Sequence, residues 1–284
     1  MSSFDTPEPI SLSVELGAGS VRIAAGDRSD TIVEVRPSDP SKRYDVTAAE
    51  QTQVEFAGGT LVVRAPRRWG RYVLGAGRES VDIEIAVPAG SGLTVEAPGG
   101  APAVYATGRL GDCVVRTGAG EIRLGAAGSV RLRTGAGDVS VDRVMGTAEV
   151  STGTGSVRIG VIEGSATIRG STAETWIGEV GGGLEVRAPC GRISVDRAED
   201  AVAAKTGFGD IRLGEVGRGA ISAETGHGRV DVGVRAGVAA WLDLQTRFGN
   251  VLSELEGAGP PQPGEESVEV RARSSFGDVT VRRS

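Results

Sequence analysis

Residue types that build many functional sites are scarce in this chain of 284 residues, which has two cysteines, one histidine and 4% aromatic residues. Two cysteines, Cys113 and Cys190, are too few for a disulfide framework and fit a reducing compartment. A zinc site needs several nitrogen or sulfur ligands, so His227 and two scattered cysteines do not predict one. The apolar content of 39% is sufficient for a core, which must consist mainly of Val, Ile, Leu and Ala.

Long hydrophobic runs and an excess of basic residues are also missing. No stretch approaches the roughly 18 consecutive apolar residues of a membrane-spanning helix. The first residues, MSSFDTPEPI, lack the basic start and apolar run of a signal peptide. We therefore expect a cytoplasmic protein without membrane insertion, with surface exposure as the alternative. The net charge of −6, with both signs interspersed, argues against nucleic acid as a partner.

Glycine is abundant, with 45 residues, and it recurs in a short phrase that is present nine times. The phrase is a turn, usually Thr-Gly-x-Gly, followed by a polar residue and an alternating apolar strand. The copies read TGAGEIRL from Thr117, TGAGDVSV from Thr134, TGTGSVRI from Thr152, GSTAETWI from Gly170, APCGRISV from Ala188, TGFGDIRL from Thr206, TGHGRVDV from Thr225, TRFGNVLS from Thr246 and SSFGDVTV from Ser274. Their starts lie 17, 18, 18, 18, 18, 19, 21 and 28 residues apart. A nearly constant period of this length is typical of a solenoid.

Each phrase predicts one coil with two short strands. After the turn at 135–137, Val139 and Val141 point to one face of a strand, and Asp138 points to the other. A second alternating strand follows at 147–151 before the next turn begins. We therefore predict an all-β fold, a parallel β-solenoid like a single-stranded β-helix, with about 18 residues and two strands per coil. No helical period is present, so we expect almost no helix.

The repeats predict a division of the chain into two parts. Residues 1–90 alternate like strands with irregular spacing, and we interpret them as a β-rich N-terminal cap continuous with the solenoid. Residues 91–284 hold the solenoid repeats, interrupted by a Pro- and Gly-rich flexible insertion at 254–267. The last coil, Asp278–Val281, has no successor in the sequence, so we expect it to form an open end of the solenoid.

The pattern resembles a bacterial family of unknown function, the putative-adhesin family with β-strand repeats. The residues that carry the resemblance are the stretch Val87-Pro88-Ala89-Gly90, the following Leu93-Thr94-Val95, and the serial Thr-Gly-x-Gly phrases. The resemblance covers the chain from about Leu12 to Val281. It implies a β-solenoid with a β-rich N-terminal part, and it supplies no catalytic residue.

Two carboxylates suggest a catalytic alternative. Glu121 and Asp138 follow the turns of adjacent coils, so their backbones would lie about 4.8 Å apart. Retaining glycosidases hold two carboxyl groups about 5 Å apart, and such a pair would indicate a carbohydrate-active β-helix enzyme. The same column also holds Arg192 and Arg229, which favours a solvated row of charges and argues against calcium. We therefore expect no catalytic residue, no metal and no cofactor.

Aromatic side chains provide the first candidate interaction sites. The middle residue of the turn becomes a ring in four successive C-terminal coils, at Phe208, His227, Phe248 and Phe276. Stacked rings there would either close the edge of the core or form a surface for a partner, and both interpretations stay open.

Two further candidates combine rings with cations. Trp176 falls on the outward register next to Arg158, where the two could make a cation–π contact on a contact surface. A loop carries the second set, which is either a binding site for phosphates or acidic partners or a solvated connection. Its residues are Arg67, Arg68, Trp69 and Arg71.

These observations favour a non-catalytic scaffold or interaction module. Its partner would be another macromolecule, with a protein or a second copy first and a glycan as a further option, reached through the faces or ends of the solenoid. A carbohydrate-active β-helix enzyme and a cell-surface adhesin are the alternatives.

Overall fold

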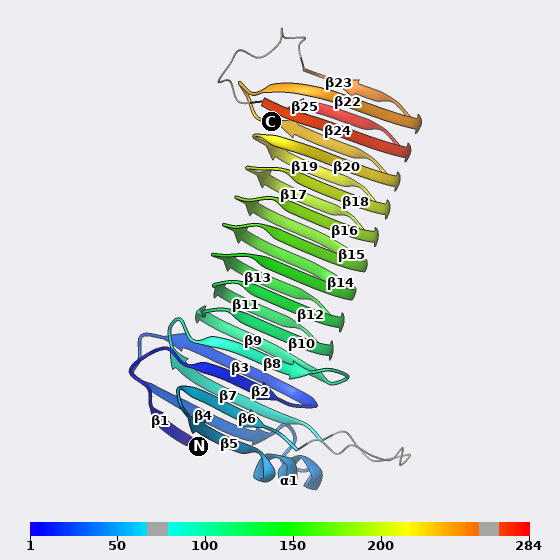
Figure 1. The fold of residues 1–284 in the computed structure, drawn as a ribbon. Helices are drawn as coiled ribbons and strands as arrows, with labels where there is room; N and C mark the ends of the chain where they lie inside the picture. The colour runs from blue at the N-terminus through cyan, green and yellow to red at the C-terminus, as the bar shows by residue number, and fades with distance from the viewer. Residues whose placement is uncertain (67–78, 256–266) are drawn as a thin grey trace. The chain divides into compact units, whose positions relative to one another are not determined.

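The structure is a computed structural model that describes residues 1–66, 79–255 and 267–284. These residues form 25 strands and one helix, so the predicted all-β class is confirmed (Figure 1). The chain divides into two compact units, Met1–Asp142 and Arg143–Ser284. The predicted insertion at 254–267 falls mostly on residues 256–266, which lie outside the described residues.

Strands of the first unit pair in an order that differs from their order along the chain. Strand β2 lies between β6 and β8 in parallel register, so that Leu12 is opposite Leu61 on one side and Leu93 on the other. Strand β3 lies in the same way between β7 and β9. The strands are β1 (Ser2–Asp5), β2 (Ser11–Glu15), β3 (Ala18–Gly26), β4 (Asp30–Pro37), β5 (Gln53–Ala57), β6 (Thr60–Arg64), β7 (Val81–Pro88), β8 (Gly92–Ala97), β9 (Ala101–Arg109), β10 (Cys113–Ala119), β11 (Ile122–Ala127) and β12 (Val130–Ala136), followed by β13 (Val139–Val144).

The predicted boundary at residue 90 stays a prediction, but parallel pairing joins residues on both sides of it. Strands β8 and β9 follow residue 90 and pair with β2 and β3, which precede it. Irregular features gather before that residue, where β4 pairs with β1 and β7 in antiparallel register and β5 pairs with β6 in the same sense. These antiparallel strands pair with the backbone N–H and C=O groups of β6 and β7 on the side where no further parallel strand is present.

One short helix is present among the described residues, α1 (Arg43–Gln51), which the repeat pattern did not predict. It has nine residues and includes Ala48, Ala49, Glu50 and Gln51, which are good helix formers. The buried Asp45 of this helix accepts a hydrogen bond from the Ser80 backbone N–H at 2.8 Å. A single helix of nine residues is too short to show a helical period in the sequence.

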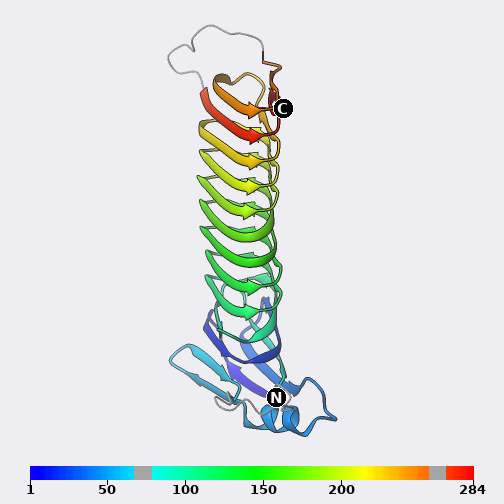
Figure 2. The ribbon, with the colours of Figure 1, turned by 90° about the vertical axis from the view of Figure 1, so that its right-hand side faces the viewer.

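In the second unit, two parallel ladders run side by side, each built from strands about one repeat apart in sequence. In one ladder, Leu184 pairs with Val202, which pairs with Ile221; in the other, Ile193 pairs with Ile211, which pairs with Val230. Figure 2 shows the strands of this unit as successive curved rungs. Its strands are β14 (Ala148–Ile162), β15 (Ala166–Val180), β16 (Leu184–Cys190), β17 (Ile193–Ala198), β18 (Val202–Phe208), β19 (Ile211–Val216), β20 (Gly219–His227), β21 (Val230–Val234), β22 (Ala239–Phe248), β23 (Val251–Ser253), β24 (Ser267–Phe276) and β25 (Val279–Arg283).

Two repeats depart from the predicted pair of short strands. Strands β14 and β15 are each 15 residues long and continue through the corner where other repeats have a break. They pair with each other from Ala148 and Ala166 to Ile162 and Val180. The second of them has Ala173 where most copies of the phrase have their second glycine, so the corner there has a different local sequence.

The end of the second unit overturns one prediction. Strand β24 lies between β20 and β22, and β25 lies between β21 and β23. Val279 therefore has Val230 on one side and Val251 on the other, so the expectation that Asp278–Val281 is the open end was wrong. The last two phrases start 28 residues apart, and this length allows the chain to pass β22 and to place β24 between β22 and β20. Among the described residues, β22 and β23 form the last rung of this unit.

Candidate interaction face

A hydrogen bond between neighbouring repeats fixes the last four corners of the second unit. The buried Thr225 hydroxyl donates to the carbonyl of Gly209 at 2.8 Å. Gly209 has φ +146°, and a Cβ placed on it would lie 2.2 Å from the carbonyl oxygen of Gly191. Only glycine fits this close approach of two backbones. The equivalent hydroxyl bonds are Thr206 to Gly191 at 3.1 Å, Ser274 to Gly228 at 2.9 Å and Thr246 to Gly277 at 2.8 Å.

These corners place the four predicted rings in one row. Ring centroids are separated by 4.8 Å from Phe208 to His227, by 4.6 Å from His227 to Phe276, and by 4.9 Å from Phe276 to Phe248. All three ring pairs are stacked with interplanar angles of 10°. We call these four residues the ring row. Phe276 stands between His227 and Phe248, because β24 is inserted between β20 and β22.

The ring row lies on the surface and does not close the core. Its three phenylalanines are 46–60% exposed, and His227 is exposed as well. Each ring face inside the row is covered by the next ring, so the row presents mainly ring edges to solvent. A sugar normally stacks on an open ring face, whereas a row of edges forms an apolar ridge. These exposures do not fit rings that close the edge of the core, and the surface for a partner stays a prediction.

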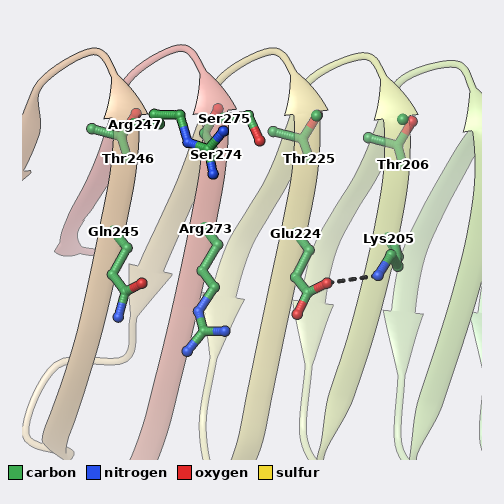
Figure 3. Close-up of a pocket in the computed structure, with 12 residues that line it drawn as sticks. Lys205, Thr206, Glu224, Thr225, Gln245, Thr246, Arg247, Arg273, Ser274 and Ser275 are labelled. Carbon is green, nitrogen blue, oxygen red and sulfur yellow. Dashed lines mark hydrogen bonds and ion pairs between the residues drawn. The ribbon is translucent and has the colours of Figure 1, made fainter.

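A groove of about 700 Å³ crosses four strands one residue before the ring row (Figure 3). Its lining includes Gly207, Gly226, Ser275 and Arg247, each of which directly precedes a ring residue. Gly207 and Gly226 have no side chains at these outward positions, and this absence provides the space of the groove. The remaining lining residues are Lys205, Thr206, Glu224, Thr225, Gln245, Thr246, Arg273 and Ser274.

Three cations and one anion line this groove. Lys205 pairs with Glu224 at 2.9 Å, and Arg273 pairs with Asp243 at 3.1 Å. The hydrogen bond from Arg273, followed by one from Gln245, lowers the pKa of Asp243 below its ordinary value. No ion-pair partner of Arg247 is found in the part of the chain that the structure describes. The groove is therefore locally basic on a chain that is acidic as a whole.

The groove was not predicted from the sequence, although a signal for it exists. The residue before the first Thr or Ser of the phrase is Lys205, Glu224, Gln245 or Arg273 in the last four repeats, and the residue after it is small in three of them. Detecting the groove would have required the order of the strands in space. In that order, Arg273 stands between Glu224 and Gln245.

Trp176 and Arg158 are register neighbours, as predicted, but the predicted cation–π contact between them is absent. The Arg158 guanidinium donates to the Ser156 hydroxyl at 2.7 Å. The indole of Trp176 lies beside Gly178, where the missing side chain leaves room, and it remains exposed. The cation–π contact among the described residues is that of Arg22 over the Tyr105 ring, with 5.8 Å to the centroid.

Among the described residues, Glu121 of the predicted carboxylate pair is held by neighbouring side chains. Glu121 accepts hydrogen bonds from the Tyr105 hydroxyl at 3.0 Å and from Arg123 at 2.6 Å, and the bond to Glu121 raises the pKa of Tyr105. Within residues 1–66, 79–255 and 267–284, no three His, Cys, Asp or Glu side chains are grouped as metal ligands would be. The predicted loop residues Arg67, Arg68, Trp69 and Arg71 lie outside the described residues.

The two cysteines are free and differ in environment. Cys113 is buried, and burial raises the pKa of its thiol to about 12. Cys190 is half-buried on β16, in the turn position that a ring occupies in later repeats. No helix of the described residues is long and apolar enough to span a membrane.

Several solved structures are similar to this chain at low identity. A "putative adhesin" from Bacteroides fragilis has 11% identity and a TM-score of 0.40, with 100% of this chain and 95% of that chain covered. A "putative adhesin" from Parabacteroides distasonis has 11% identity, a TM-score of 0.36 and the same coverage. A "putative cell adhesion protein" from Clostridium sporogenes has 12% identity and a TM-score of 0.19, with 100% and 98% covered. No curated protein matches the sequence.

The family comparison covers nearly the whole chain and agrees with the resemblance seen in the sequence. The family model described as Toastrack DUF4097 matches residues 10–283, which include all nine copies of the phrase. The chain belongs to the Toastrack DUF4097 family, a putative-adhesin family of unknown function.

Proposed function

We propose that the chain is a non-catalytic interaction scaffold that binds a protein partner through the ring row and the adjacent groove. The observation that carries this proposal is the exposure of three stacked phenylalanines, at 46–60%, one residue from a basic groove. Exposed apolar patches rimmed by polar residues commonly mark interaction sites. For the fold, we propose a β-solenoid of about 18 residues per coil. Most coils have two strands, and in two coils these are replaced by the single long strands β14 and β15.

The lining of the groove favours an acidic, extended segment of the partner. Lys205, Arg273 and Arg247 line it, against Glu224 alone. Existing ion pairs with Glu224 and Asp243 leave donors of Lys205 and Arg273 available, because an ammonium has three donors and a guanidinium has five. An acidic segment in the groove would place its apolar side chains against the ring row.

A glycan partner is less favoured by the same geometry. The rings inside the row cover one another at 4.6–4.9 Å, so their faces are not open for sugars. The enzyme alternative gains no support from Glu121, which accepts hydrogen bonds from Tyr105 and Arg123. An adhesin role requires the chain to reach the cell surface, and fractionation of the native cell with surface labelling tests it.

The binding proposal is tested with a fluorescein-labelled oligoglutamate peptide, followed by fluorescence anisotropy. We expect saturable binding that weakens as salt rises, because exposed charges are screened. The double substitution Lys205→Ala and Arg273→Ala should weaken peptide binding about 3- to 10-fold, because it removes two exposed ion pairs with the peptide. Arg212→Ala, on the other ladder, is the matched control and should leave binding unchanged.

The contribution of the ring row is tested with a second peptide, in which some glutamates are replaced by leucine. This peptide should bind more tightly than oligoglutamate, and Phe276→Ser should remove the difference. Absence of binding to both peptides, or equal binding by the double variant, would refute the proposed site.

A further inference from the structure

The last rung of the second unit has an unpaired side. Strand β22 pairs with β24, β23 pairs with β25, and no other partner of β22 or β23 is found among the described residues. Strand β22 is ten residues long, so one long row of backbone N–H and C=O groups faces away from β24. Such an edge readily pairs with another strand.

Apolar side chains are exposed on this rung. Trp241 is 70% exposed and Leu252 is 53% exposed. Val251 is 47% exposed, whereas Val279, its neighbour in the same column, is 0% exposed. A further rung would cover Val251 as β23 covers Val279. The core is therefore incomplete at this side of the described structure.

The usual protection of an edge strand is missing from β22. Its sequence, AAWLDLQTRF, contains no proline and no lysine, and its inward positions Leu242 and Leu244 carry no charge. Its two charged residues are Asp243 and Arg247, which have opposite signs and point to the same outward face. Solvent-exposed edges normally carry proline, lysine or an inward charge to prevent pairing.

The charges of β22 are complementary to those of a second β22 in reverse direction. In an antiparallel pair with Gln245 opposite itself, Asp243 of each copy faces Arg247 of the other. Directly opposite residues share one face of a sheet, so both charge pairs form on the outward side, and Leu244 of each copy meets Thr246 of the other on the core side. Arg247, which has no ion-pair partner among the described residues, gains one in this arrangement.

We propose that two copies of this chain associate through the β22–β23 edge, about a two-fold axis that passes beside Gln245. The contact continues both ladders from one copy into the other and covers Val251 and Leu252. Twofold contacts of this kind are self-complementary and close after two copies. This association shares Gln245 and Arg247 with the groove proposed above. Its charge pairs join Asp243 to Arg247, so its test does not use the Lys205 and Arg273 variants of the peptide experiment.

The charge pairs provide a direct test by sedimentation equilibrium, from low to several hundred micromolar protein. We expect a monomer–dimer equilibrium for the natural chain. Asp243→Arg alone and Arg247→Asp alone each place like charges opposite one another, so each should weaken the dimer at least ~10-fold. An equimolar mixture of the two variants should restore dimerisation, because each copy then faces opposite charges.

Mixing separates a direct contact from a loss of folding, since a misfolded variant would not recover by being mixed with another. Circular dichroism of each variant provides the control on folding. The substitution Arg212→Asp, away from the edge, should leave the equilibrium unchanged.

The register is tested by a disulfide. Gln245→Cys in a Cys190→Ser background should form a covalent dimer on mild oxidation, because directly opposite residues of an antiparallel pair lie about 4.5–5.5 Å apart at Cα. Arg212→Cys in the same background should not. A chain that stays monomeric at the highest concentration overturns the proposal. This holds both if residues of the same chain cover the β22 edge and if the edge stays unpaired. A dimer that is unaffected by either charge variant and gives no disulfide at position 245 also overturns it.

Discussion

In the last four copies of the repeated phrase, the hydroxyl of the first Thr or Ser joins neighbouring repeats by a hydrogen bond. Thr225 donates to Gly209 at 2.8 Å, while the buried hydroxyl of Thr117 has no hydrogen-bond partner among the described residues. Replacement of Thr225 by Val keeps the shape and removes the bond, so we expect a loss of about 1 kcal/mol in the free energy of unfolding. Thr117→Val removes an unsatisfied polar group and should be neutral or stabilising. Urea denaturation of the two variants measures the difference, and equal losses would contradict this interpretation.

The second glycine of the phrase is required by the close approach of two backbones as well as by its φ. A Cβ on Gly209 would lie 2.2 Å from a carbonyl oxygen, whereas a Cβ on Gly237, with φ +82°, would have no neighbour within 4 Å. Gly237→Ala should therefore cost about 1–2 kcal/mol, the penalty of the left-handed backbone alone. Gly209→Ala adds a backbone clash and should cost more than about 4 kcal/mol or prevent folding. Thermal unfolding compares the two, and similar midpoints would show that the clash is relieved.

The two thiols should differ in reactivity. Burial of Cys113 covers its sulfur and holds the pKa at about 12, so almost no thiolate forms at pH 8. Ellman's reagent at that pH should titrate one thiol in the native chain and two in guanidinium chloride. In Cys190→Ser the native reaction should disappear, and an undiminished reaction in that variant would mean that Cys113 is accessible.

At the scale of the element, an ion cluster joins three successive repeats at the ends of their strands. Arg235, after β21, pairs with Glu199 at 2.6 Å and with Glu215 at 2.9 Å. The hydrogen bond from Arg235, together with a weaker one from Ser284, lowers the pKa of Glu215 below its ordinary 4.5. The cluster connects the residues that directly follow β17 and β21 with Glu215 near the end of β19, so its strength depends on the charge state of these side chains.

The lowered pKa of Glu215 makes this contribution dependent on pH. A group with a depressed folded-state pKa stabilises the fold above its unfolded pKa, and the stability is lost as pH falls through the folded value. We therefore expect the free energy of unfolding to decline below about pH 4.5, and Glu215→Gln to decline less steeply. Urea unfolding at several pH values between 3 and 7 measures both slopes. Parallel slopes would assign the acid sensitivity to other carboxylates.

Strand order has consequences at the scale of the second unit. Strand β24 is close to the C-terminus, where chains commonly fray, yet it has a neighbour on each side, whereas β22 has one among the described residues. Amide hydrogens of β22 should exchange faster than those of β24 at protein concentrations low enough to prevent association. Hydrogen exchange followed by mass spectrometry measures this order, and faster exchange in β24 would indicate that the terminal repeat opens first.

Much of the architecture could be predicted because it depends on short-range patterns. The alternation of Val139 and Val141 with polar residues predicts strands, and the recurrence of the phrase predicts parallel pairing between repeats such as Leu184 with Val202. The ring row was likewise predicted as a stack, since residues at one position of a repeat lie in register. The cation–π contact of Trp176 was not realised, because the side chain found room beside Gly178.

Period and alternation thus specify which residues face inward, which faces are shared, and that β-strands dominate, because each of these follows from local backbone geometry. The order of the repeats in space follows from a different cause. Val251 and Val279 are both apolar and both suit any rung, so a choice between them requires the energy of the complete packed unit and the length of the chain that connects them. That choice places Phe276 inside the ring row, Arg273 inside the groove and β22 at the edge, and it could not be made from any repeat considered alone.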